Sequence, residues 1–180
     1  MTESFDPLSV PVRPAATVML VRDHPLNGLE VFMLQRTMSA VFAKGMYVFP
    51  GGRVDAADDT SDLQSVCDDL SDERASSILG VASGGLAFWI AAIRECFEEA
   101  GVLLARPEAG QHPVRFDEAA VAERFAHARH HVHDATLTLV ELCRREGLRL
   151  ITDTMHYVSH WITPVGEPRR FDTRFFVAQM

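Results

Sequence analysis

The chain has 180 residues, of which 47% are hydrophobic and 23% charged; these values fit one globular domain and argue against disorder over the whole length. The formal net charge of −8 disfavours a nucleic-acid coat protein, because neutralising phosphates requires a basic surface. Three widely spaced cysteines, Cys67, Cys96 and Cys143, predict no disulfide framework and favour a reducing, cytoplasmic location.

The N-terminal third of the chain predicts β-strands. Residues 16–21 (ATVMLV) and 29–35 (LEVFMLQ) flank a segment rich in turn formers, so they predict a hairpin. Residues 45–49 (GMYVF) predict a third strand, which ends at the Pro-Gly-Gly of residues 50–52.

An acidic segment follows. Residues 55–73 hold eight acidic side chains and no lysine or arginine. Leu63, Val66 and Leu70 recur at three- and four-residue steps, which favours a short amphipathic helix. We interpret residues 55–85 as an exposed, solvated insertion; a specificity loop over an active site is the alternative.

Three helices are predicted next. Apolar side chains recur at helical spacing in residues 86–100, and Gly101 is placed to end this helix in the left-handed conformation. Residues 117–131 predict a second helix, and residues 135–146 a third with Asp134 as its N-cap. These last two helices lie in a stretch, residues 105–147, that carries no recognisable motif.

Strands return at residues 155–163 and 170–178. The order of strands, helices and strands predicts an α/β (α+β) fold with a mixed sheet. The chain stops directly after the last predicted strand. Either this is a shortened form of the domain or a partner subunit completes it.

The strongest chemical signal is a group of glutamates in the first predicted helix. Glu95, Glu98 and Glu99 stand at i, i+3 and i+4, so they project from one helix face and repel one another. A solvated helix surface is one interpretation. A Mg²⁺ ion bound through carboxylate oxygens is the other, with Arg94 holding a glutamate in its working orientation.

The pattern RExxEExG of residues 94–101, preceded by FPGG at residues 49–52, resembles the Nudix box of the Nudix hydrolases. At average residue frequencies a chance match over this length has odds of about one in several thousand. Two features depart from the family pattern. Gly52 and Arg94 are 42 positions apart, with no residue matched to the glutamate of the family's short loop, and Cys96 replaces a larger aliphatic residue.

The resemblance implies a Nudix-like α/β/α sandwich that hydrolyses a nucleoside diphosphate linked to another group, with Mg²⁺ or Mn²⁺. The metal ligands it implies are Glu95, Glu98, Glu99 and the carbonyl of Gly51. Glu95 is also the candidate for deprotonating water, and Arg94 orients the glutamates. A small-molecule diphosphate is the expected partner, with no nucleic-acid polymer and no membrane, and a homodimer is expected by analogy.

Residues 33–36 (MLQR), 161–164 (WITP) and 169–178 (RRFDTRFFVA) narrow the resemblance to a subgroup with split boxes. Some members of that subgroup are coenzyme A or acyl-CoA diphosphatases, so a CoA-type substrate leads. An ADP-ribose, dinucleotide or nucleoside triphosphate diphosphatase is the alternative. A Nudix-like binding module without catalysis is a further alternative.

Other polar residues remain open to two interpretations. Arg36 and Arg53 flank the FPGG segment and, with Gly52, are candidates for binding the substrate; the alternative for each arginine is a surface position without a role. The histidine run comprises His127, His130, His131 and His133. Surface histidines are favoured over a zinc site there, because no cysteine lies near and no fourth ligand is evident.

Overall fold

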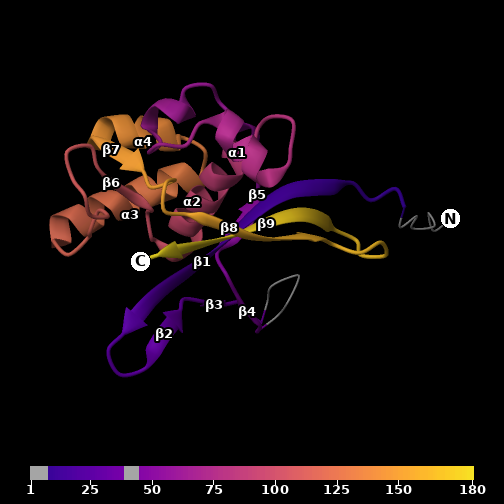
Figure 1. The fold of residues 1–180 in the computed structure, drawn as a ribbon. Coiled ribbons are helices and arrows are strands. Elements are labelled where there is room, and N and C mark those ends of the chain that lie inside the picture. The colour runs from indigo at the N-terminus through magenta and orange to yellow at the C-terminus, as the bar shows by residue number, and fades with distance from the viewer. Residues whose placement is uncertain (1–7, 39–44) are drawn as a thin grey trace.

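The computed structural model describes residues 8–38 and 45–180. Its main element is a five-stranded mixed sheet in the order β2–β1–β9–β8, with β5 also paired to β1 (Figure 1). These strands are β1 (Val12–His24), β2 (Gly28–Val31), β5 (Gly51–Arg53), β8 (His156–Ile162) and β9 (Arg170–Gln179). β1 and β9 run parallel and the other pairs run antiparallel. The predicted mixed sheet with helices is confirmed.

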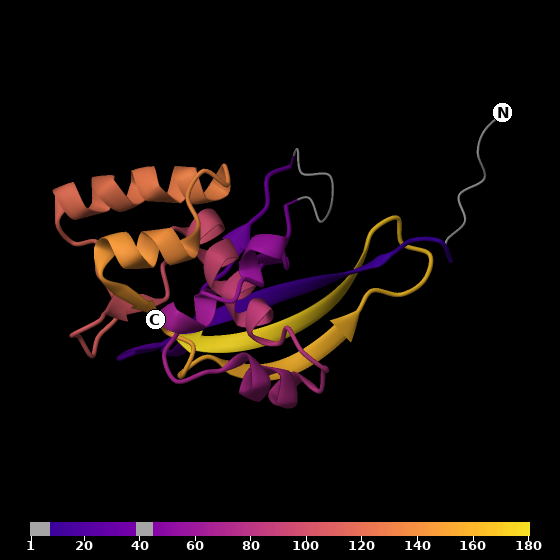
Figure 2. The same ribbon diagram turned by 90° about the horizontal axis from the view of Figure 1, so that it is seen from above.

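The helices gather on one face of this sheet, as Figures 1 and 2 show from two directions. They are α1 (Asp72–Leu79), α2 (Leu86–Ala100), α3 (Ala119–His133) and α4 (Leu139–Glu146), with 3₁₀ turns η1 (Ala56–Asp58) and η2 (Leu63–Val66). Two small strand pairs, β3 (Leu34–Gln35) with β4 (Tyr47–Val48) and β6 (Ala105–Pro107) with β7 (Leu148–Leu150), complete the fold. None of the helices within the described ranges has the length and apolar character to cross a membrane.

The core lies between β1, β9 and α2. Ala16, Val18 and Leu20 alternate along β1 and are fully buried, as expected for a strand with one face toward the helices. The predicted apolar face of α2 packs on them, and Trp89 lies 4.5 Å from Phe176 of β9, measured between ring centroids. α2 spans the predicted residues and ends at Gly101, whose φ of 71° confirms the left-handed cap.

Three predicted elements need correction. The strand expected at residues 29–35 is divided into β2 and β3, because β3 leaves the hairpin to pair with β4. The strand predicted at residues 45–49 is only Tyr47–Val48 long and ends before the glycines as expected, but the glycines themselves form the unpredicted strand β5, which pairs with β1. The third helix begins at Leu139, not residue 135, because Thr138 is its N-cap and Ala135 adopts a left-handed φ of 54°.

The predicted exposed, solvated character of residues 55–85 is wrong for three of its acids. Asp58 is only 3% exposed. Asp68 pairs with Arg106 and Arg149, at 2.5 and 2.6 Å. Asp72 accepts hydrogen bonds from two backbone N–H groups at the start of α2, those of Gly84 and Leu86. The insertion is therefore anchored to the rest of the domain by its charged side chains as well as by its buried leucines.

Candidate active site

The three glutamates lie on the last two turns of α2, next to β5. An added Cβ on Gly52 would lie 2.3–2.6 Å from the carboxylate atoms of Glu95, so the carboxylate occupies the space that any other residue at position 52 would fill. Gly51 is crowded differently, because its added Cβ would meet the backbone oxygen of Ala16 at 2.5 Å. The double glycine therefore allows β5 to lie close both to β1 and to the face of α2 that carries the three glutamates.

Arg94 connects the helix to its surroundings. Its Nη1 donates to Oε1 of Glu95 at 2.9 Å and to Oε1 of Glu98 at 3.1 Å. Its Nη2 donates to the backbone carbonyl of Arg53 at 2.8 Å. The contact between Arg94 and the glutamates, implied by the family resemblance, is present, and the same guanidinium fixes β5 against α2.

Asp58 is the site residue that the sequence did not reveal. Its two oxygens accept from Nε and Nη2 of Arg94, at 2.9 and 3.0 Å, and Oδ2 also accepts from the backbone N–H of Asp55. Burial raises the pKa of Asp58, and the hydrogen bonds from Arg94 partly offset that effect. The only available signal was its place in the acidic segment that follows Gly52, which did not distinguish it from the other acids there.

Glu99 faces the other glycine. Its Oε2 accepts from the backbone N–H of Gly51 at 3.1 Å. The carbonyl of Pro50 bonds to β1, through the N–H of Val18. Since neighbouring residues of a strand bond to opposite sides, the carbonyl of Gly51 lies on the side of α2, together with its N–H. This position is compatible with the predicted role of that carbonyl as a metal ligand.

The carboxylate and carbonyl oxygens of this site are the ligand atoms that a hard divalent cation prefers. Burial raises the pKa of both Glu95 and Glu99, and the opposing effects of Arg94 on Glu95 and of Arg36 on Glu99 do not cancel it. Within residues 8–38 and 45–180, however, no group of three or more Asp, Glu, His or Cys side chains already surrounds a common point. Glu95 Oε2 and Glu99 Oε1 have no hydrogen-bond partner among the described residues, so these oxygens are free for a cation while Arg94 keeps its bonds.

The helical stretch without a motif contributes two contacts to α2. Arg129 of α3 donates from Nε to the carbonyl of Glu98 at 2.8 Å and from Nη2 to the carbonyl of Glu99 at 3.0 Å. His133 places Nδ1 3.2 Å from Oε2 of Glu98. The last carbonyls of a helix lack partners within the helix and form the negative end of its dipole. A cationic side chain that donates hydrogen bonds to them therefore stabilises the helix end. Arg129 therefore caps the turn that carries two of the glutamates.

The predicted substrate-binding residues lie near β5, in different environments. Arg36 is half-buried, and its charge opposes the rise in the pKa of Glu99 that burial causes. Its Nε is buried without a hydrogen-bond partner in the described part of the chain. The side chain of Arg53 is 54% exposed and lies 3.6 Å from Asp55. Gly52 lies against the carboxylate of Glu95. The role of these three residues in binding substrate stays a prediction.

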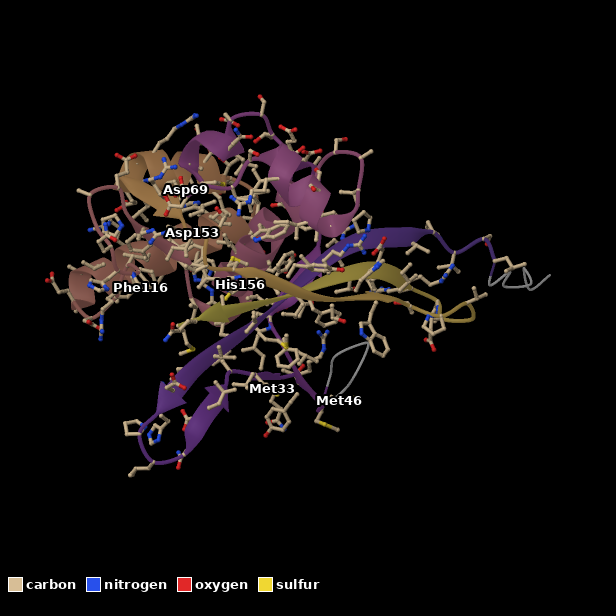
Figure 3. All side chains as sticks on the ribbon, in the orientation of Figure 1. Met33, Met46, Asp69, Phe116, Asp153 and His156 are labelled. Carbon is tan, nitrogen blue, oxygen red and sulfur yellow. The ribbon has the colours of Figure 1, made fainter. Side chains whose placement is uncertain are left out.

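The remaining candidates lie elsewhere. His131 meets Thr136 at 2.9 Å, and His127 and His130 are exposed. His156 borders a cavity of about 350 Å³ that none of the three glutamates lines. Figure 3 labels its Asp69 and Asp153 on the helix side of the sheet, whereas Met33 and Met46 lie on the opposite side. Cys96 is fully buried, and burial raises its pKa to about 12.

Comparisons with known proteins agree with this geometry. The family described as the NUDT19 Nudix domain matches residues 71–180. The acyl-coenzyme A diphosphatase NUDT19 of Homo sapiens is 30% identical over 195 residues, which cover 92% of this chain and 52% of the human protein. The Gallus gallus protein of the same name is 29% identical over 205 residues, which cover 92% of this chain and 54% of that protein. The chain thus spans about half the length of these curated relatives.

A solved structure shares the fold. The crystal structure of a NUDIX hydrolase from Alicyclobacillus acidocaldarius superposes with a TM-score of 0.65 and 26% sequence identity. The superposition covers 96% of this chain and 71% of that protein. Because a family match extends over more than half of the chain and the same fold recurs in a solved relative, this protein belongs to the Nudix hydrolase family.

Proposed function

We propose that this protein hydrolyses the diphosphate linkage of coenzyme A or an acyl-CoA with the help of a divalent cation. The observation that carries the proposal is the row of three carboxylates on α2, with Glu95 in the space left by Gly52 and Glu99 bonded to the N–H of Gly51. The named relatives support the choice of a CoA-type substrate. A reducing, cytoplasmic location is part of the proposal, because the three cysteines are unpaired.

The residues that would hold the cation are Glu95, Glu98, Glu99 and the carbonyl of Gly51. Enzymes of this family typically depend on such a metal. A bound Mg²⁺ or Mn²⁺ supplies charge neutralisation for the diphosphate and lowers the pKa of an attacking water. Without it, this acidic protein would repel its substrate.

The side chains divide the remaining work. Glu95 is the candidate for accepting the proton of water, because burial raises its pKa and makes the carboxylate a stronger base. Arg94 fixes the orientation of Glu95 and Glu98 through Nη1. Arg36 offers, on the side of Glu99, a buried N–H that has no partner within residues 8–38 and 45–180, and such a group suits a phosphate oxygen. Water adds to one phosphorus and the bridging P–O bond breaks, so CoA would give 4′-phosphopantetheine and adenosine 3′,5′-bisphosphate.

The test is a substrate panel with and without Mg²⁺ or Mn²⁺, comprising CoA, an acyl-CoA, ADP-ribose, a dinucleotide and a nucleoside triphosphate. We expect turnover of the CoA compounds that chelation abolishes. Glu98→Gln should lose most turnover while staying folded, whereas the matched control Glu123→Gln, an exposed acid on α3, should not. Wild-type rates for Glu98→Gln would remove Glu98 from the mechanism, and binding without turnover would favour a binding module.

The phosphate contacts have a separate test. Arg36→Ala should raise KM for the preferred substrate by about tenfold or more, because a charged hydrogen bond to phosphate is lost. Arg53→Ala should raise KM less, since its side chain is half exposed and lies near Asp55. An unchanged KM in either variant would remove that arginine from the substrate site.

A further inference from the structure

A small cavity lies beside Glu98, on the side that faces α3. Its volume is about 150 Å³, and it opens between η1, α2 and the turn that joins α3 to α4. Glu98 and Arg94 form part of its wall, so the cavity borders the glutamate site on the side of Glu98. The stretch without a sequence motif supplies the opposite wall, which includes His133 and Leu137. The cavity is therefore placed to contact whatever lies next to a bound diphosphate.

The acids in the wall already have partners. Both oxygens of Asp58 accept from Arg94, and Glu98 accepts from Arg94 and meets His133. Part of the lining is apolar, because Ile90, Val132 and Leu139 contribute to it and are at most 5% exposed; Asp55, His133 and Thr138 are its other polar side chains. A group entering the cavity would gain from burying carbon, at about a fourfold change in affinity for each methylene-sized unit. A charged or hydroxyl-rich group would gain no polar partner from the three apolar side chains, and Asp58, Arg94 and Glu98 already bond one another.

The turn that closes the cavity is held in an uncommon conformation. Ala135 lines the cavity with a φ of 54°, a left-handed value that residues other than glycine rarely adopt. The N–H of Ala135 donates to the carbonyl of Val132, and the next two N–H groups both donate to the carbonyl of His131. Strain of this kind persists only where the surroundings determine it, and here it fixes the cavity wall in place.

We propose that this cavity binds the dimethyl-substituted carbon of the pantetheine arm of coenzyme A, an inference that rests on the proposed function. In CoA that branched carbon follows the diphosphate after a single methylene, so it is the first bulky group on that side of the reacting phosphorus. In ADP-ribose and in dinucleotides the corresponding group is a hydroxyl-rich sugar. The cavity volume equals that of about five water molecules, which suits a compact branched unit but not the whole arm.

The inference is tested by filling the cavity and measuring each half of the substrate separately. Ala57→Phe, at an exposed residue of the wall, and Leu137→Trp, at a half-buried one, both add volume. We expect kcat/KM for CoA to fall at least tenfold and the inhibition constant of 4′-phosphopantetheine to rise by a similar factor. The inhibition constant of adenosine 3′,5′-bisphosphate should change less than twofold. Leu26→Trp, at a 90% exposed position of the β1–β2 turn, is the matched control and should leave all three values unchanged.

The outcomes separate this inference from the proposed function. Equal weakening of both product halves, or no weakening of either, in the Ala57 variant would overturn the subsite, whether or not the Leu137 variant folds. A wild-type protein that hydrolyses ADP-ribose but not CoA would overturn the subsite and leave a diphosphatase of another specificity. A wild-type protein without activity on any diphosphate would refute the proposed function, and the subsite with it.

Discussion

Gly52→Ala tests whether the space above β5 belongs to the carboxylate of Glu95. The added methyl group would lie 2.3 Å from Oε1 of Glu95, whereas ordinary contact begins near 3.4 Å, so the carboxylate must move by about 1 Å. Only the end of a flexible side chain has to yield. We therefore expect the protein to fold and the site to be displaced.

The magnitudes follow from the contacts. Moving the carboxylate weakens its 2.9 Å bond to Arg94, and a hydrogen bond between charged groups is worth about 1.5–3 kcal/mol. Replacing glycine by alanine also stabilises the protein by about 0.4–1 kcal/mol, because it reduces the conformational entropy of the unfolded chain. The net loss of about 1–2 kcal/mol lowers Tm by about 2–8 °C for a domain of this size. A 1 Å misplacement at a reacting centre can reduce kcat by about a hundredfold.

The neighbouring glycine provides the contrast. In Gly51→Ala the methyl group would meet the backbone of Ala16 and Thr17 at 2.5 and 2.8 Å, and backbone atoms in a strand cannot yield separately. We expect a loss of stability of about 3 kcal/mol, larger than that of Gly52→Ala. Thermal unfolding and kcat with Mn²⁺ are measured for both variants. A wild-type kcat in folded Gly52→Ala, or a larger Tm loss in Gly52→Ala than in Gly51→Ala, would refute this account of the site.

Three further predictions concern the charges around α2. Asp58→Asn removes the buried partner of Arg94 and should lower the free energy of unfolding by about 3 kcal/mol in urea titrations, and a loss below 1 kcal/mol would contradict its anchoring role. Arg129→Ala should lower kcat about tenfold, because the turn that carries Glu98 and Glu99 loses its cap. Arg129→Lys should restore part of the rate, since lysine can reach one of the two carbonyls. Equal rates in the two variants would argue against the cap. Because the folded-state pKa of Glu99 is raised above the ordinary value of about 4.3, the folded protein binds more protons between these two values. In the absence of metal, the free energy of unfolding should then fall as pH rises through that window, and this fall should be smaller in Glu99→Gln. Identical pH profiles of the wild type and the variant would exclude this contribution of Glu99.

The sequence predicted α2 and its cap most accurately, because a fifteen-residue apolar periodicity and a following glycine act locally. It also placed Arg94 next to the glutamates, a contact between residues one and four positions apart. The errors arise where contacts with segments distant in sequence determine the local structure. β5 exists because β1 offers it an edge, and its two glycines gave no strand signal of their own. Ala135 adopts a helix-incompatible φ, which only the bonds of its turn impose.

The contacts of Asp58 and Arg129 could not be predicted for a related reason. Each bonds α2 across more than 30 sequence positions, and neither spacing has a local period. The acidic composition of residues 55–73 pointed toward solvent, since most charged runs are solvated. Asp58 departs from that rule because a single buried guanidinium, that of Arg94, can bond both of its oxygens.

The same contacts explain how a Nudix box can be divided by 42 positions without losing its helix geometry. Asp72 of the insertion bonds the N–H groups at the start of α2, where the helix has no side-chain cap of its own. Asp58, at the other end of the insertion, bonds Arg94 in the middle of the helix, and Arg129 bonds the carbonyls at its end. The insertion therefore replaces the short loop by fixing α2 at two points. The position of the glutamates depends on these bonds and not on the length of chain between Gly52 and Arg94.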